Sequence, residues 1–310
     1  MPAPPTDLAA LRGALGIRAR ADHPIGPLTT YRVGGAAALF AEPGDEAQLV
    51  ALARGLTGLD VPVLPLGRGS NLLVADRGFE GLVVSLGAGF DRLSIDGDRV
   101  EAGAAVSLPV LARRTAAAGL QGLEWAVGVP GSVGGAIRMN AGGHGSDTAA
   151  TLVAYRWVDL VSGLVHEAPA ERLGFGYRHT DLAPTDVVVA GVYRLEPGRP
   201  EESRATIDEI VRWRRANQPG GSNAGSVFTN PPGDSAGRLI EECGLKGFRI
   251  GTAEVSIKHA NFIQADPGGS ADDVERLLAH VKAEVAAATG VDLRPEVRLV
   301  GFSESRTGGG

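Results

Sequence analysis

The segment from residue 128 to residue 145, GVPGSVGGAIRMNAGGHG, has glycine at seven of its eighteen positions and carries few bulky side chains. Glycine weakens helices and strands, so such a segment is typical of places where bare backbone approaches another group closely or adopts positive φ. Its backbone N–H groups suit an acceptor-rich ligand such as a nucleotide pyrophosphate. The spacing matches neither GxGxxG nor a P-loop. Taken alone, the segment indicates either a ligand cradle or a set of tight turns between strands.

A second glycine-rich loop interrupts the apolar sequence LPLGRGSNLLV at residues 64–74. An apolar strand is predicted to end there in a tight turn whose backbone donors suit a phosphate group. The loop contains, in order, Gly67, Gly69, Ser70 and Asn71. Neither loop alone is specific, but the pair predicts one extended dinucleotide held between two lobes.

The composition is that of a folded protein with no strong basic character. Of the 310 residues, 44% are hydrophobic and 21% are charged, which predicts about two or three domains. The net charge of -6 argues against a nucleic-acid partner, since neutralising phosphates takes a clustered basic excess. One short basic cluster, Arg212, Arg214 and Arg215, suits a small anionic ligand or a solvated helix face equally well.

Targeting, membrane and metal-binding patterns are not found in the sequence. The first residues, MPAPPTDLAALRG, contain no apolar run of signal-peptide length, and no segment reaches the roughly 18 apolar residues of a membrane span. We therefore expect a cytoplasmic protein without a membrane partner. Cys243 is the only cysteine, which excludes an intramolecular disulfide, and the histidines lack metal-binding spacing, so no metal is expected.

Hydrophobic periodicity predicts a mixed α+β fold. Short apolar runs rich in β-branched residues predict strands at 61–66, 81–86, 151–160 and 186–195. Helices are predicted over 45–56 and over 107–119, the second between Ser107 as N-cap and Gly119 as the terminal glycine.

A charged helix over 202–216 is predicted to mark a domain boundary, because it ends at Gln218-Pro219. The residues after it predict a helix over 235–244, a strand at 253–257, a helix over 270–290 and a last strand at 297–300. The tail, residues 301–310, is predicted to be disordered.

Three polar side chains stand in loop or turn sequence beside apolar or glycine-rich segments: Arg178, Ser226 and Glu296. Ser226 follows a small-residue turn, as a reactive hydroxyl does, but its motif is not GxSxG and no histidine lies in a hydrolase-like context. From the residues alone, each has an ordinary structural explanation. These explanations are a salt bridge for Arg178, a cap or turn hydroxyl for Ser226 and a surface charge at a strand edge for Glu296.

Taken in order, these motifs resemble those of the UDP-N-acetylenolpyruvoylglucosamine reductase family, the MurB family. The resemblance extends over nearly the whole chain. It begins with LTTYRVGGAAALFAEP at 28–43 and includes LGRGSNLLV, GVPGSVGGAIRMNAGGHG, YRHTDL, NAGSVFTNPP, GLKGFRIGTAEVSIKHANFI and RPEVRLVG. The short interval between Arg178 and Ser226 resembles the family's compact subgroup, which lacks an inserted tyrosine-bearing loop.

The resemblance implies a fold of two parts. An FAD-binding domain of the vanillyl-alcohol-oxidase (PCMH) type would occupy residues 1–200, with a two-lobed core at about 31–196. A smaller α+β substrate-binding domain would occupy residues 201–300, and the last strand would return to the first lobe. FAD would be bound noncovalently, because the loop at 67–71 offers no histidine or cysteine to tether it.

The implied reaction is the reduction of UDP-N-acetylglucosamine enolpyruvate to UDP-N-acetylmuramate in peptidoglycan precursor synthesis, with NADPH as the reductant of FAD. A monomeric enzyme is expected. Two alternatives stay open: another FAD-dependent oxidoreductase of the same superfamily acting on an alcohol or sugar, and a nucleotide-sugar-binding protein without turnover. Oxygen consumption without an enolpyruvyl substrate would favour the first, and absence of bound flavin would favour the second.

By motif, three residues carry the implied chemistry. Arg178 and Glu296 would stabilise the negative charge that develops on the substrate carboxylate, and Ser226 would donate a proton as the general acid. Glu296 would help only when it carries or shares a proton, since a bare carboxylate repels the growing charge.

The binding residues that the resemblance implies lie largely in the two glycine-rich loops. The FAD contacts would be Gly67, Arg68, Gly69, Ser70, Asn71, Pro130, Gly131, Ser132, Gly134, Gly135, Asn140, Ala141 and Gly142. The substrate contacts would be Asn230 and Asn261, with Arg214 or Arg215 meeting the UDP phosphates. The chain departs from the commoner family pattern at Thr229, where a lysine often precedes the asparagine, and at Arg68, where the loop often has glycine.

Overall fold

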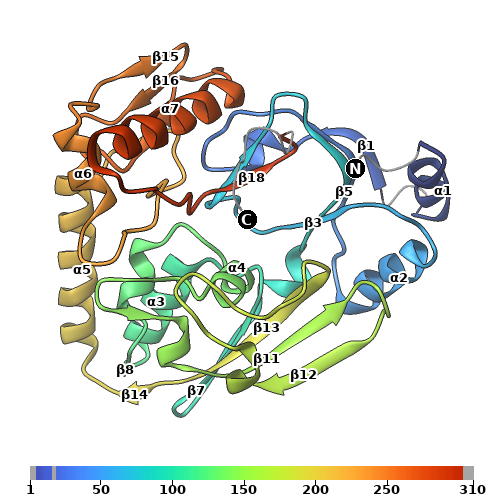
Figure 1. Cartoon of the computed structure of the whole chain (residues 1–310). Helices are drawn as coiled ribbons and strands as arrows, with labels where there is room; N and C mark the ends of the chain where they lie inside the picture. The colour runs from blue at the N-terminus through green and yellow to red at the C-terminus, as the bar shows by residue number, and fades with distance from the viewer. Residues whose placement is uncertain (1–4, 16–18, 303–310) are drawn as a thin grey trace. The chain divides into compact units, whose positions relative to one another are not determined.

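The computed structural model describes residues 5–15 and 19–302 (Figure 1). Within these limits the chain forms two compact units, each assembled from several stretches. Among the described residues, the first unit comprises 5–15, 19–21, 39–68 and 81–214, and the second comprises 22–38, 69–80 and 215–302. These units differ from the predicted division near residue 200, because two early stretches group with the C-terminal part of the chain. The assignment of FAD and substrate binding to separate domains stays a prediction, and the tail beyond residue 302 lies outside the described residues.

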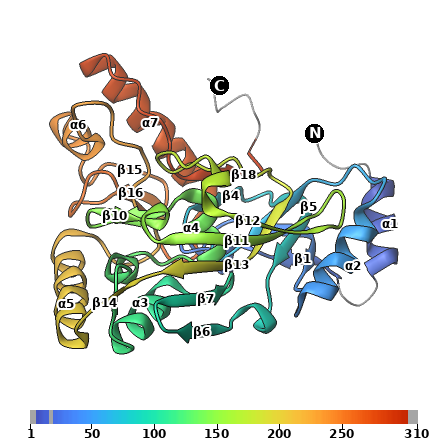
Figure 2. The same ribbon diagram turned by 90° about the horizontal axis from the view of Figure 1, so that it is seen from below.

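The main sheet of the first unit is antiparallel, with strand order β12-β11-β13-β7-β6 (Figure 2). Its strands are β6 (Leu93–Asp96), β7 (Arg99–Gly103), β11 (Leu152–Asp159), β12 (Val165–Pro169) and β13 (Asp186–Arg194). Two helices, α3 (Leu108–Ala117) and α4 (Val133–Met139), contribute to the same core, and α4 packs against β13. A Cβ at Gly191 would lie 2.7 Å from Cδ1 of Ile137, so glycine permits this close approach.

A four-stranded sheet with the order β1-β2-β5-β3 lies mostly in the first unit as well. Its strands are β1 (Ala19–Pro24), β2 (Ala36–Ala41), β3 (Val63–Leu66) and β5 (Phe79–Ser85). The helices α1 (Pro5–Leu15) and α2 (Glu46–Leu56) lie side by side (Figure 2) and share a core with this sheet. Asp45 begins α2, because its carboxylate accepts a hydrogen bond from the N–H of Gln48 at 2.8 Å.

Shorter elements connect these layers. In the first unit they are β8 (Leu120–Gln121) paired with β14 (Glu196–Pro197), β9 (Gly142–Gly143) paired with β10 (Ser146–Asp147), and the 3-10 helices η3 (Ala88–Phe90), η4 (Glu124–Gly128), η5 (Thr148–Ala150) and η6 (Ala170–Leu173). The long helix α5 (Pro200–Asn217) follows β14.

In the second unit, α7 (Ala271–Thr289) lies along a small antiparallel sheet (Figure 1). The strands of this sheet are β15 (Arg249–Ile250), β16 (Ala253–Val255) and β17 (Ile263–Ala265), and α6 (Ala236–Glu242) packs against α7. The unit also contains η2 (Gly26–Leu28) and the parallel pair β4 (Leu72–Val74) and β18 (Arg298–Val300). Buried Leu73, Val274 and Leu277 belong to one core.

The N-terminus of α7 binds the carboxylate of Asp76, which follows β4. Asp76 accepts hydrogen bonds from the N–H groups of Ala271 at 2.9 Å and Asp272 at 3.2 Å. A carboxylate is favourable there because the first amides of a helix lack partners within the helix. The contact ties the strand after the first glycine-rich loop to the longest helix of its unit.

Every strand and helix predicted from hydrophobic periodicity is present, with boundaries shifted by a few residues. Two α-helices were not expected: α1, which no predicted range covers, and α4, which lies inside the glycine-rich segment. The apolar residues of α4, Val133, Ala136 and Ile137, are buried, and packing against β13 outweighs the poor helix propensity of its glycines. The segment is therefore neither a set of turns alone nor a bare loop.

Candidate functional site

The beginning of the first glycine-rich loop, up to Arg68, and the second glycine-rich segment both belong to the first unit. β3 ends at Leu66, and a Cβ placed on the next residue, Gly67, would lie 2.7 Å from Oγ of Ser132. A side chain at Gly67 would therefore require the Ser132 hydroxyl to move. Gly67 and Ser132 bring parts of the two glycine-rich segments close together, while the binding of one dinucleotide by both stays a prediction.

Amide N–H groups in both segments lack a partner within the protein. In the described parts of the chain, no acceptor is found for the N–H groups of residues 67–71, nor for those of Gly131 and Ser132. Gly69, Gly131 and Ser132 are nevertheless buried. Buried amides without an acceptor are rare in proteins, so the donors of each segment suit a ligand rich in oxygen acceptors.

The next amides of the glycine-rich segment are occupied by the protein itself. Val133 donates to the carbonyl of Val106 and Gly134 to that of Ala104, both at 2.9 Å, and the N–H of Gly135 lies 3.4 Å from Oγ of Ser132. A Cβ on Gly134 would lie 2.9 Å from the Cβ of Ala104, whereas a Cβ on Gly135 would meet only Ser132 Oγ, at 3.6 Å. Gly134 is thus required for packing, while Gly135 is exposed.

Asn140, at the end of α4, holds the turn that carries Arg178. It is 5% exposed and has a φ of +39°, a left-handed conformation that asparagine tolerates. Its Nδ2 donates to the carbonyl of Gly176 at 3.1 Å, and its Oδ1 accepts from the N–H of Ala149 at 3.1 Å. The predicted FAD contact at Asn140 is therefore also a structural link between α4 and the Arg178 turn.

Arg178 stands at the tip of a tight turn closed by Gly176 and His179. Its φ is +55°, and its Nη2 donates to the carbonyl of Gly142 at 3.0 Å. The guanidinium carbon lies 5.2 Å from the ring centroid of Tyr177, a cation–π distance. The sequence did not indicate a role for Tyr177, whose side chain is 66% exposed. Only its position next to Arg178 could have drawn attention to it.

Ser226 and Glu296 are brought together in the second unit. The residue after Ser226, Val227, accepts a hydrogen bond through its carbonyl from the N–H of Glu296 at 2.8 Å. Both predicted catalytic residues are half-buried. Nδ2 of Asn71 donates to the carbonyl of Glu296 at 3.1 Å, which links the end of the first glycine-rich loop to the same segment. The third predicted catalytic residue, Arg178, belongs to the first unit.

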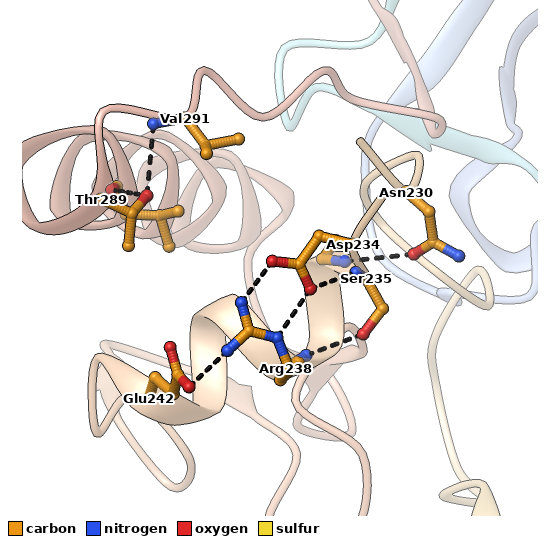
Figure 3. A network of polar contacts seen from close by, with 9 residues as sticks. Asn230, Asp234, Ser235, Arg238, Glu242, Thr289 and Val291 are labelled. Carbon is orange, nitrogen blue, oxygen red and sulfur yellow. Dashed lines mark hydrogen bonds and ion pairs between the residues drawn. The ribbon is translucent and has the colours of Figure 1, made fainter. Parts of the chain in front are cut away.

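Asn230 is the more accessible of the two predicted substrate asparagines. Its Oδ1 accepts from the N–H of Ala236, at the start of α6, at 3.1 Å (Figure 3). Nearby, Arg238 pairs with Asp234 and lowers the pKa of that carboxyl to about 2. Figure 3 shows the amide nitrogen of Asn230 pointing away from this network, where it is available as a donor.

Asn261 is 3% exposed, and its side-chain amide is occupied by the protein. Its Oδ1 accepts from the N–H of Phe228 at 3.0 Å, and its Nδ2 donates to the carbonyl of Phe228 at 2.8 Å. This is not the exposed amide that a substrate contact requires. The burial arises because Asn261 joins two segments that are distant in sequence.

The basic cluster divides between the two units. Arg214 lies beside the start of the glycine-rich segment, since a Cβ on Gly128 would be 3.2 Å from its Cδ, and burial lowers the pKa of Arg214. The ring of His144 lies edge-on to Trp213 with 5.3 Å between centroids, and burial together with the charge of Arg214 lowers the pKa of His144. Arg215 is exposed, and its carbonyl accepts from Nζ of Lys258. His144 was missed by the sequence argument, although it lies inside the glycine-rich segment.

No cluster of histidine, cysteine, aspartate or glutamate side chains suited to a metal ion occurs within residues 5–15 and 19–302. Over the same residues, no helix has the length and apolar character needed to cross a bilayer.

Two protein families match the chain. Residues 37–168 match the family described as FAD binding domain, and residues 217–300 match the family described as UDP-N-acetylenolpyruvoylglucosamine reductase, C-terminal domain. The loop at Gly131 and Ser132, like the loop at 67–71, therefore lies within the FAD-binding match.

Relatives match along almost the entire sequence. A UDP-N-acetylenolpyruvoylglucosamine reductase from Heliobacterium modesticaldum is 45% identical over 293 residues, covering 93% of this chain and 92% of the relative. One from Rubrobacter xylanophilus is 42% identical over 286 residues, covering 91% of this chain and 95% of the relative. The crystal structure of the enzyme of this name (MurB) from Thermus caldophilus superposes with a TM-score of 0.81 at 36% identity, covering 91% of this chain and 99% of that one.

Proposed function

We propose, from the premise that the chain belongs to the UDP-N-acetylenolpyruvoylglucosamine reductase family, that it reduces UDP-N-acetylglucosamine enolpyruvate to UDP-N-acetylmuramate. The observation that carries the proposal is the hydrogen-bonded pairing of the Ser226 and Glu296 segments in a chain similar to these reductases over nearly its full length. The reaction belongs to peptidoglycan precursor synthesis, and we assign the enzyme to the cytoplasm and to cell-wall biogenesis, cell shape and division.

FAD is the cofactor, and the residues present fit it. The unpaired amides of residues 67–71, Gly131 and Ser132 supply the donors that its diphosphate requires, and the side chain of Arg68 is exposed beside them. We assign Pro130, Gly135, Ala141 and Gly142 to the walls of this cradle. No histidine or cysteine occurs at 67–71, which favours noncovalent attachment. Bound FAD, reduced by a nicotinamide for which we propose NADPH, supplies the hydride.

Residues of the chain stabilise the negative charge that develops on the substrate and supply the proton that completes the reaction. Hydride addition to the terminal vinyl carbon moves negative charge into the substrate carboxylate. The guanidinium of Arg178 donates parallel N–H bonds to that carboxylate, and protonated Glu296 donates one more. Ser226 gives its hydroxyl proton to the carbon that bears the ether oxygen, which completes the lactyl ether, and solvent returns the proton to Ser226. Asn230 offers its amide donors, and Arg214 or Arg215 its charge, to the UDP part of the substrate.

The test is a pair of anaerobic half-reactions, followed by the absorbance of oxidised flavin at about 450 nm. Adding NADPH is expected to bleach the band, and adding UDP-N-acetylglucosamine enolpyruvate is expected to restore it. Bleaching without recovery would contradict the substrate assignment and leave a flavoprotein of another specificity. Oxygen consumption with an alcohol or sugar would then identify an oxidase of the same fold, and absence of the band would refute the cofactor assignment.

Two adjacent glycines separate the packing role of α4 from its role in the FAD cradle. Gly134→Ala is expected to lower the free energy of unfolding of the flavin-free protein by about 1–3 kcal/mol, because the new Cβ overlaps Ala104. Gly135→Ala is expected to leave that free energy almost unchanged, since its Cβ has room, and to weaken FAD binding. Thermal unfolding and FAD titration of both variants measure the two effects. Wild-type FAD affinity in Gly135→Ala would remove Gly135 from the cradle.

A further inference from the structure

The buried amide of Asn261 forms a two-point contact with the backbone of Phe228, two residues after Ser226. It donates to the carbonyl of Phe228 and accepts from its N–H, at 2.8 and 3.0 Å. The carbonyl of Asn261 also accepts from the N–H of Val227, at 2.9 Å. Asn261 therefore pairs with residues 227–228 as a neighbouring strand would, through its side chain as well as its backbone.

This contact requires asparagine. The side chain must supply one donor and one acceptor at a fixed separation, and an amide is the only short group that does so. Aspartate would place a second acceptor against the carbonyl of Phe228 and bury a charge at a position that is 3% exposed. An apolar residue would leave both backbone groups of Phe228 buried without partners.

The opposite side of the same segment is held by the residues around Glu296. Val227 accepts from the N–H of Glu296, and the N–H of Thr229 donates to the carbonyl of Arg294 at 2.9 Å. Residues 227–229 therefore lie between Asn261 and the strand-like segment at 294–296. Loss of the Asn261 side-chain amide would leave the backbone bond from Val227 to Asn261 and the bonds on the Glu296 side, but nothing in the described part of the chain would hold the N–H and carbonyl of Phe228.

Before Ser226 the chain is held at Ser222, whose carbonyl accepts from the N–H of Ala265 at 3.0 Å, and at buried Ala224, but not at Gly225. Gly225 has a φ of +77°, and a Cβ placed there would meet nothing within 4 Å. Its N–H binds only the side chain of Asn223, at 3.0 Å, in a local turn. The residues nearest to Ser226 whose backbone groups bond to other segments are therefore Val227 and Phe228, on its C-terminal side.

We propose that Asn261 is a positioning residue for proton transfer: by fixing the backbone of Val227 and Phe228 it holds Ser226 in place relative to Glu296. The inference rests on the proposed function, in which Ser226 acts only when the substrate is reduced. Loss of the Asn261 amide therefore slows the half-reaction that consumes the substrate and spares the reduction of FAD by NADPH.

The experiment compares the two half-reactions by rapid mixing in wild type, Asn261→Ala and Asn261→Ser. In both variants, reduction by NADPH is expected to stay at the wild-type rate. Reoxidation by substrate is expected to slow by about 10- to 100-fold, because a small misplacement of a reacting group has an effect of this order. We expect kcat of both variants to fall and KM for the substrate to stay nearly unchanged. The solvent deuterium isotope effect on reoxidation is expected to rise, since proton transfer becomes slower.

Two comparisons separate positioning from general loss of structure. The double variant Ser226→Ala with Asn261→Ala is expected to be no slower than Ser226→Ala, because Asn261 acts through Ser226. Thr252→Ala is the matched control in the same unit. It removes two partly buried hydrogen bonds of the Thr252 hydroxyl, one to Asp273 at 2.9 Å and one from the N–H of Ser270 at 2.8 Å, and is expected to leave the ratio of the two half-reactions unchanged.

Equal slowing of both half-reactions, or additive losses in the double variant, would overturn the proposal. Loss of folded protein in both Asn261 variants would overturn it as well and assign Asn261 to stability. If wild-type enzyme bleaches with NADPH but is not reoxidised by the substrate, the proposed function itself fails and the positioning role fails with it.

Discussion

Ser226→Ala is expected to slow reoxidation of the reduced enzyme by UDP-N-acetylglucosamine enolpyruvate by about 10²- to 10⁴-fold, the range found for removal of a general acid. The hydroxyl is the proton donor in the proposed reaction, and alanine supplies none. Reduction by NADPH is expected to proceed at the wild-type rate. Folding is expected to be unaffected, because the backbone bonds that hold the segment come from Val227 and Phe228 and not from the Ser226 side chain.

Stopped-flow absorbance of the flavin resolves the two steps in a single preparation. Ser222→Ala is the matched control, because Ser222 is a half-buried serine of the same loop that pairs with Ala265 through its backbone. It is expected to behave as wild type in both half-reactions. Wild-type reoxidation in Ser226→Ala would exclude Ser226 as the proton donor.

Arg178→Lys is expected to lower kcat by about 10²- to 10³-fold, as for the loss of a donor to a developing oxyanion. Lysine keeps the charge but loses the planar fork that binds a carboxylate at two points. It also loses the geometry of the contacts to Gly142 and to the Tyr177 ring, which orient the guanidinium. We expect a larger effect on kcat than on KM, because the charge to be stabilised grows during the reaction.

Steady-state kinetics with the enolpyruvyl substrate measures the Arg178 effect, and thermal unfolding checks the fold. Arg172→Lys, an exposed arginine in η6 of the same unit, is the control and is expected to keep the wild-type kcat. An unchanged kcat in Arg178→Lys would refute the proposed role. A loss confined to KM would reassign Arg178 to substrate binding in the ground state.

Local patterns explain why the longest strands and the helices α2, α3, α5, α6 and α7 could be predicted. The apolar runs of β11 and β13 and the helical spacing of Val274, Leu277 and Val281 in α7 are properties of a few neighbouring residues. The pattern failed for α4, where glycine content concealed a short apolar stripe. Its helical state depends on β13, which lies far along the chain.

The site was predictable to the extent that its residues carry motifs. Ser226 and Glu296 were named from sequence, and the structure pairs their segments. For the asparagines, sequence could not distinguish Asn230, whose amide nitrogen is accessible, from Asn261, whose amide is buried against Phe228. That difference depends on a contact between residues 33 positions apart, and composition near either asparagine does not reveal it.

The amino-acid sequence by itself determined the family and indicated the longest strands and most of the helices, because motifs and periodicities are local, while the roles of Arg178, Ser226 and Glu296 stay predictions. Only the tertiary structure decided which amides stay unpaired, that Gly67 meets Ser132, and that Asn261 supports the Ser226 segment. The physical reason is that a hydrogen bond or close contact between distant segments depends on the packing of the whole unit. No window of sequence contains that information.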